Sequence, residues 1–112
     1  MKIDGLIPPP ESKVLFKRAS DKSIPQDSGC YIITNFENSI LYIGLASNLK
    51  NRFKQHLDNP EKTNPTIDGK AIWFYFKKYE IKNLPKLERS WLNQFNDVNG
   101  RRPILNKVDS PV

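Results

Sequence analysis

The chain has 112 residues, which is the length of one domain with a modest hydrophobic core. An apolar share of 38% is too high for a disordered chain, and no apolar run approaches the ~20 residues that a transmembrane helix needs. A net charge of +6, from 18 basic and 12 acidic residues, suits a polyanionic partner such as nucleic acid. The alternative is a soluble surface that happens to be basic.

A single cysteine, Cys30, cannot form a disulfide within the chain and favours a reducing compartment. The opening residues contain no continuous apolar stretch, so no secretory signal is expected. These observations predict a cytoplasmic location without membrane contact.

The first predicted unit is a Pro-rich arm, residues 1–28, in which 13–16 form either an edge strand or a turn. Residues 29–34 are rich in β-formers and predict a strand, and 40–43 predict a second one. The polar residues between them are typical of a turn, so the two strands should pair as an antiparallel hairpin. Gly44 is expected to end it.

A helix is predicted next, with Ser47 as its N-cap. Arg52 and His56 are four residues apart, so they share one stripe of this helix. Residues 58–70 are expected to be a polar loop. The buried stripe of the helix has the same four-residue spacing and consists of Leu49, Phe53 and Leu57.

Residues 71–76 are apolar on both alternating faces, which predicts a central strand covered on each side. A second helix should begin near Leu84, with Pro85 in its first turn, and end before Gly100. Glu88 lies at the edge of its buried stripe. That stripe comprises Leu84, Leu87, Trp91 and Phe95.

The resulting order is β-β-α-β-α with a C-terminal turn, which is an α+β fold of a small sheet with helices. Three segments are expected: the arm at 1–28, a domain at 29–106 and a tail at 107–112.

Several short motifs occur in a fixed order along this predicted fold, and together they resemble the GIY-YIG endonuclease family between Gly29 and Asn106. Cys30 is a departure, because the family usually has isoleucine there, and a small apolar residue should fit that position. The shared features are G-C-Y at 29–31, Y-I-G at 42–44, the helix at 49–56, Glu88 and L-N at 105–106.

The resemblance implies a three-stranded antiparallel sheet flanked by helices and one divalent metal ion at the active site. It also implies hydrolysis of a phosphodiester to a 5′-phosphate and a 3′-hydroxyl. Tyr31 and Tyr42 match the two tyrosines of the family motif. Gly29 and Gly44 match structural turns beside them.

Four further residues match family positions. Arg52 corresponds to the helix arginine, and His56 to the position four later, which is histidine or tyrosine in relatives. Glu88 corresponds to the metal-binding glutamate, which is a suitable ligand for Mg²⁺ or Mn²⁺. Asn106 corresponds to the C-terminal asparagine and is expected to tie that segment to the site.

The chemistry explains these residue types. Arg52 can hold a non-bridging phosphate oxygen with its planar guanidinium. Tyr31 is the candidate general base if nearby cations such as Arg52 lower its pKa, and His56 can accept its proton. Tyr42 is expected to orient the water or the phosphate, and the metal on Glu88 to stabilise charge on the phosphate.

Basic residues around the motif form a second layer. The functional interpretation is a collar that contacts phosphates without reading bases, and the alternative is ordinary solubility. Further lysines, among them Lys62, follow the first helix and the third strand. The residues expected to contact nucleic acid are Lys50, Arg52, Lys54, Arg101 and Arg102.

Three functions follow. The first is a Mg²⁺-dependent DNA endonuclease in which Tyr31, Tyr42, Arg52, His56, Glu88 and Asn106 form the site. The second is a non-catalytic DNA-binding module that keeps the fold, and the third is a protein-interaction domain with a basic surface. The short arm predicts weak or structure-based selectivity, or dependence on a homodimer or a separate targeting partner.

Overall fold

Residues 1–106 are described by the computed structural model of the chain, and the predicted tail at 107–112 lies outside them. One antiparallel sheet forms the centre, with strands in the order β1-β4-β2-β3. The α+β prediction is confirmed, but a sheet of three strands was wrong, because residues from the N-terminal segment pair with β4 as a fourth. The strands are β1 (Ser12–Leu15), β2 (Gly29–Thr34), β3 (Ile40–Ala46) and β4 (Trp73–Lys78).

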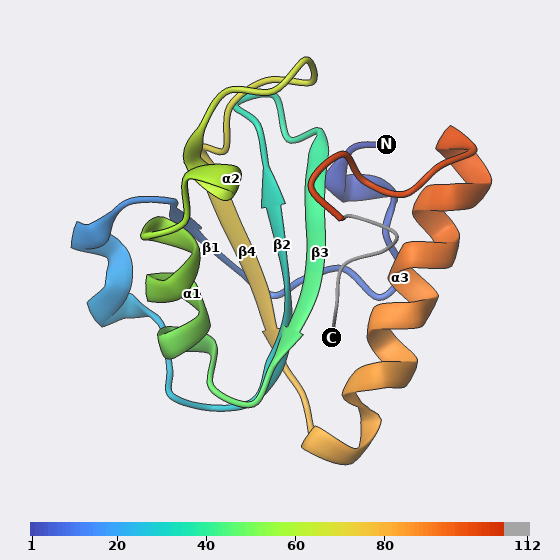
Figure 1. The fold of residues 1–112 in the computed structure, drawn as a ribbon. Coiled ribbons are helices and arrows are strands. Elements are labelled where there is room, and N and C mark those ends of the chain that lie inside the picture. The colour runs from blue at the N-terminus through green and yellow to red at the C-terminus, as the bar shows by residue number, and fades with distance from the viewer. Residues whose placement is uncertain (107–112) are drawn as a thin grey trace.

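Two layers of helix cover the two faces of the sheet (Figure 1). Helices α1 (Leu49–Leu57) and α2 (Pro60–Thr63) lie on one face, and the long helix α3 (Leu84–Asn99) covers the other. The alternation along β2 explains the division, because successive side chains of a strand point to opposite faces. Tyr31 therefore packs with the α1 layer and Cys30 with the α3 layer.

The ends of the helices are set by local capping. Asn48, and not the predicted Ser47, caps α1, because its side chain accepts a hydrogen bond from the Asn51 backbone N–H at 3.1 Å. Helix α2 interrupts the predicted loop, since Asn59 caps it and a proline occupies its first turn. Helix α3 ends as predicted, at Gly100 in the left-handed conformation with φ 69°.

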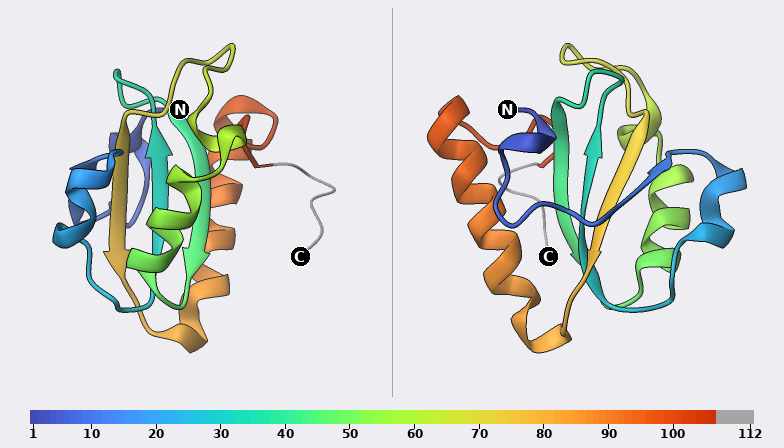
Figure 2. Two further views of the ribbon diagram at one scale, coloured as in Figure 1. Left: turned by 60° about the vertical axis from the view of Figure 1, so that its left-hand side comes forward. Right: turned by 180° about the vertical axis from the view of Figure 1, so that it is seen from behind.

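Residues at the N-terminus pack against α3, on the face of the sheet away from α1 (Figure 2). Leu6 is buried there, the indole Nε1 of Trp91 donates to the Pro8 carbonyl at 2.9 Å, and Ile7 exchanges two hydrogen bonds with Gln94. The division of the chain into arm, domain and tail stays a prediction. No helix among the described residues is both long and apolar enough to cross a membrane.

Candidate active site

A closed aromatic cluster lies between the sheet and α1. The Tyr31 hydroxyl lies 2.6 Å from His56 Nε2, and the Tyr31 and Tyr42 ring centroids are 5.8 Å apart. The ring of His56 completes the triangle, 5.2 Å from Tyr42. Tyr31 has no exposed surface and stacks on Phe74, whereas Tyr42 is half-buried. Tyr42 is therefore the tyrosine of the pair that solvent reaches.

Gly44 makes room for this cluster. It pairs with Tyr31 in the register of β2 and β3, and a Cβ atom on it would lie 2.6 Å from the Tyr31 hydroxyl and 2.7 Å from Tyr42 Cε2. The prediction that Gly29 and Gly44 form turns was wrong, because both lie inside strands. They are needed for close approach: a Cβ on Gly29 would lie 2.4 Å from the Lys77 carbonyl oxygen.

Burial sets the protonation of the central pair. It raises the pKa of Tyr31 well above its ordinary value, and the nearby Arg52 only partly opposes this. The expectation that cations lower the pKa of Tyr31 was therefore wrong in direction. Burial, with the charges of Lys62 and Arg52, lowers the pKa of His56 to about 3. The imidazole is neutral at physiological pH, and in its Nδ1–H tautomer it accepts a hydrogen bond from the Tyr31 hydroxyl at Nε2.

This depressed pKa predicts an acid-sensitive fold. Below pH 6.5 the unfolded chain protonates His56 while the folded protein does not. This contribution to stability is complete above pH 6.5 and is lost as pH falls toward about 3, on the order of 5 kcal/mol. Because His56 is the only histidine, NMR titration of its ring protons checks the pKa directly. A midpoint near 6.5, or equal acid sensitivity in His56→Gln, would contradict the prediction.

Arg52 extends from α1 to the outer edge of the sheet. Its Nη1 donates to the Leu45 carbonyl of the edge strand β3 at 3.3 Å, and its side chain is half-buried. Arg52 also acts electrostatically on both Tyr31 and His56. A planar donor group fixed beside two neutral proton-carrying groups is suited to hold an anionic oxygen against them.

Glu88 is on the other layer. It lines a groove of about 370 Å³ together with Arg89 and Arg102. Burial raises the pKa of Glu88, and the charges of the two arginines partly oppose this effect. Among residues 1–106, no hydrogen bond or ion pair joins Glu88 to the tyrosines or Arg52. The structure thus gathers the phenols, the imidazole and Arg52, and leaves the carboxylate apart from them.

The surroundings of Arg52 and of Glu88 are linked through a pair of residues on β3 and β2. Leu45, whose carbonyl binds Arg52, pairs in register with Cys30. The charge of Glu88 acts on Cys30 and, after burial, is the second cause that raises the pKa of its thiol to about 12. Arg52 and Glu88 therefore act on two paired residues of neighbouring strands, Arg52 on Leu45 of β3 and Glu88 on Cys30 of β2. Cys30 itself is buried and uncharged, as a small apolar group would be.

Asn106 closes this edge. Its carboxamide exchanges two hydrogen bonds with the backbone of Ile43, both 2.8 Å long, in the manner of a neighbouring strand. The preceding Leu105 donates to the Leu41 carbonyl at 2.9 Å. The C-terminal segment is thereby held against the strand that carries Tyr42 and Gly44.

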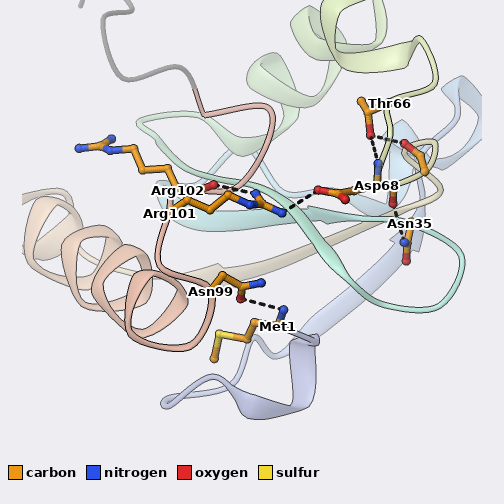
Figure 3. Close-up of polar contacts among 8 residues, drawn as sticks. Met1, Asn35, Thr66, Asp68, Asn99, Arg101 and Arg102 are labelled. Atoms are coloured by element: carbon orange, nitrogen blue, oxygen red, sulfur yellow. Dashed lines mark hydrogen bonds and ion pairs between the residues drawn. The ribbon is translucent and has the colours of Figure 1, made fainter.

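The predicted phosphate collar has members with different surroundings. Lys54 forms an ion pair with Asp21 at 3.7 Å, and Lys50 is half-buried on α1. Arg101 forms an ion pair with Asp68 of the loop after α2 at 2.9 Å. Arg102 extends in the opposite direction (Figure 3), toward the groove that contains Glu88. Their contacts with nucleic acid stay predictions.

A polar network around Asp68 holds the C-terminal segment and two loops together (Figure 3). The Asp68 carbonyl accepts from Asn35 Nδ2 at 2.9 Å, and its backbone N–H donates to Thr66 Oγ1 at 3.1 Å. The ammonium group of Met1 donates to Asn99 Oδ1 at 3.0 Å close by. Arg101 is therefore part of the scaffold that supports Asn106.

Sequence reasoning gave Lys62 no individual role, yet it lies at the site. Its Nζ is 4.7 Å from the centroid of the Tyr42 ring, and its charge lowers the pKa of His56. The available signal was the Asn59-Pro60 pair, an N-cap followed by a helix-starting proline, which predicts a turn that brings the next residues back toward α1.

The metal-ligating side chains of the described residues indicate which kind of metal ion could bind. No group of three or more His, Cys, Asp or Glu side chains gathers at one point among the described residues, so a structural zinc site does not fit them. Mg²⁺ and similar hard ions bind through one or two carboxylates together with waters and phosphate oxygens. The half-buried Glu88 fits that requirement as a single protein ligand.

Comparison with known proteins finds a matching family and several similar relatives. The model of the GIY-YIG catalytic domain matches residues 27–102. UvrABC system protein C of Alkaliphilus metalliredigens is 31% identical over 85 residues, which cover 76% of this chain and 13% of that protein. The same protein from Prochlorococcus marinus subsp. pastoris is 36% identical over 44 residues, or 39% of this chain and 7% of the relative. The chain thus spans only a small part of these relatives.

Proposed function

Because the chain belongs to the GIY-YIG family of catalytic domains, and is an endonuclease domain of that type acting on phosphodiester bonds, we propose that it hydrolyses DNA with a divalent metal ion. The products carry a 5′-phosphate and a 3′-hydroxyl. The single observation that carries this proposal is the hydrogen-bonded Tyr31–His56 pair with Tyr42 and Arg52 around it. In this arrangement, proton acceptors lie beside a cation that can hold phosphate.

Arg52 binds the scissile phosphate. Its guanidinium lies at the outer edge of the sheet, bound to the Leu45 carbonyl, and presents a planar, positively charged set of donors. A phosphodiester that replaces this weak 3.3 Å contact gains a charge-assisted hydrogen bond. Arg52 thereby reduces the repulsion between the phosphate and an incoming nucleophile.

The proton of the attacking water passes into the aromatic cluster. Tyr42 is half-buried and orients the water, while the buried Tyr31 takes up its proton and gives its own to His56 Nε2. His56 becomes an imidazolium in this step. A bound phosphate offsets the positive field of Arg52 and Lys62, so the pKa of His56 rises when substrate is present. The base is thus strengthened by the substrate itself.

Glu88 would hold the divalent ion, for which we propose Mg²⁺ or Mn²⁺. When bound, such an ion stabilises negative charge on the phosphate and on the departing oxygen. Arg102 lines the groove of Glu88 and keeps positive charge there. Members of this family generally use divalent metal ions, and the single carboxylate here supports one ion of this kind.

Nicking of supercoiled plasmid in Mg²⁺ or Mn²⁺, with EDTA as a blank, tests the proposal. Arg52→Ala is expected to lose about 10²- to 10³-fold in rate, which is typical when one charge-stabilising donor is removed. Arg18→Ala is the matched control, because that exposed arginine pairs with Asp58. Two results would refute the nuclease proposal. In one, the wild type leaves duplex, branched and single-stranded DNA intact in both metals. In the other, Arg52→Ala cuts at the wild-type rate.

A non-catalytic DNA-binding module is the second candidate. It predicts salt-dependent DNA binding with no cleavage in any metal. Dependence on a second copy or a separate targeting partner, and a cytoplasmic location, also remain proposals. A requirement for a second copy predicts that cleavage rises steeply with protein concentration.

A further inference from the structure

Lys62 covers the exposed side of the aromatic cluster. Its ammonium group lies 4.7 Å from the centroid of the Tyr42 ring, which is the half-buried tyrosine of the site. A cation in this position is attracted to the negative face of the ring. Lys62 belongs to α2, whereas Arg52 belongs to α1. Two helices therefore contribute cations to the site.

The position of Lys62 is built into the chain. Asn59 caps α2 through a hydrogen bond of 3.0 Å from the Glu61 backbone N–H, and its carbonyl accepts from the Lys62 backbone N–H at 2.9 Å. Pro60 occupies the first turn of the helix. A capped and proline-started turn presents the lysine from a defined backbone, unlike a lysine on an open loop.

Arg52 and Lys62 approach different points of β3. Arg52 binds the Leu45 carbonyl, and Lys62 lies over Tyr42, three residues earlier on the same strand. Three residues span about 10 Å along a strand. Both cations nevertheless act on His56. Two contact points spaced in this way along β3 suit neighbouring phosphates of one nucleic acid strand better than two oxygens of one phosphate.

We propose that Lys62 is a second phosphate-binding residue of this site. Its ammonium group moves from the Tyr42 ring to the backbone phosphate next to the one that Arg52 holds. The ligand is a phosphodiester of a DNA strand, so this inference rests on the proposed function. A phosphate binds an ammonium group through its full negative charge, which attracts the group more strongly than a ring quadrupole does. Binding would draw the ammonium group away from the Tyr42 ring.

The test compares Lys62→Met, which keeps the length of the side chain without its charge, with Lys62→Arg. Lys82→Met is the control, because Lys82 is exposed and pairs with Glu80 away from the site. A duplex oligonucleotide is bound at several salt concentrations without divalent metal. The slope of log Kd against log salt should fall by about 0.9 in Lys62→Met, the value for one duplex phosphate contact, and stay unchanged in Lys82→Met.

Two further readouts separate phosphate binding from a structural role. The pKa of the single histidine, followed by NMR, should rise when the duplex is added to wild type and should already be raised in free Lys62→Met. In cleavage, Lys62→Met should raise KM about tenfold at a smaller change in kcat, with Lys62→Arg restoring most of the loss. Melting temperatures equal to that of wild type show that the fold is kept.

The outcomes distinguish the two proposals. DNA binding by wild type with the same salt slope in Lys62→Met would overturn the role of Lys62 and leave the nuclease proposal standing. A reduced slope without cleavage by wild type would support the phosphate contact and count against the nuclease. No binding of the duplex by wild type at low salt would overturn both.

Discussion

Glu88→Gln is expected to lower DNA cleavage in Mg²⁺ by about 10³-fold and to leave the folded protein at least as stable as wild type at neutral pH. The carboxylate is the proposed metal ligand, and its neutral isostere is a far weaker one. Loss of a metal ion that stabilises phosphate charge costs several kcal/mol of transition-state stabilisation, or about three factors of ten in rate. A single substitution should therefore separate activity from stability.

The stability part follows from the raised pKa of Glu88. Burial favours the protonated form in the folded protein, so above pH 4.5 ionisation of Glu88 costs more in the folded than in the unfolded state. Its contribution to stability is present below pH 4.5 and is lost as pH rises through the raised pKa. Glutamine does not titrate, so the stability of Glu88→Gln relative to wild type should increase from pH 4.5 to pH 7.

Plasmid nicking and denaturant unfolding at several pH values measure the two effects. Glu80→Gln is the matched control, because Glu80 is exposed and pairs with Lys82. It should change neither quantity. The assignment of Glu88 fails if Glu88→Gln cuts at more than about a tenth of the wild-type rate, or if it unfolds more easily than wild type at neutral pH.

Gly44→Ala is expected to destabilise the fold by about 2–3 kcal/mol, the usual cost of overpacking a core, and to lower cleavage by about 10²-fold. The added Cβ would lie 2.6 Å from the Tyr31 hydroxyl and 2.7 Å from Tyr42 Cε2. Both contacts are with aromatic rings, and Tyr31 is fixed between Phe74 and the His56 hydrogen bond. The rings must move together, so a displacement of about 1 Å at the reacting groups follows.

Thermal unfolding and the nicking assay measure this pair of effects. Gly5→Ala is the control, since its Cβ would meet only the flexible end of Met1 at 3.2 Å. It should melt and cleave like wild type. Wild-type melting and cleavage in Gly44→Ala would mean that the two tyrosines can yield without cost.

Elements with a strong local signal were predictable from the sequence. The alternation in β4, the four-residue stripe of α1 and the Pro85 and Gly100 limits of α3 all appear where the pattern placed them, within a few residues. Short elements were harder to predict. An edge strand was one of two alternatives for residues 13–16, where β1 lies, and α2 falls in a segment predicted as a loop. Each has four residues and is fixed by tertiary pairing or a single cap.

The sequence indicated which side chains lie near one another better than it indicated their pKa values. The family resemblance implied that Tyr31 and Tyr42 share a site with the arginine and histidine of α1, and the two tyrosines do contact that histidine. The sequence shows the cation beside Tyr31 but not the depth at which the phenol is buried, and burial decides the direction of its pKa shift. The place of Gly44 inside a strand likewise depends on a ring that approaches from the neighbouring strand.

The contact between Asn106 and Ile43 has a consequence for the order of folding. The hairpin partners of β3 are close in sequence and pair early, whereas Asn106 is 63 positions away and arrives late. Until it does, the outer rim of the sheet has unsatisfied amides and carbonyls that a second unfolded chain could occupy. Asn106, together with the Leu105 backbone, thus protects the sheet edge from aggregation as well as supporting the strand that carries Tyr42.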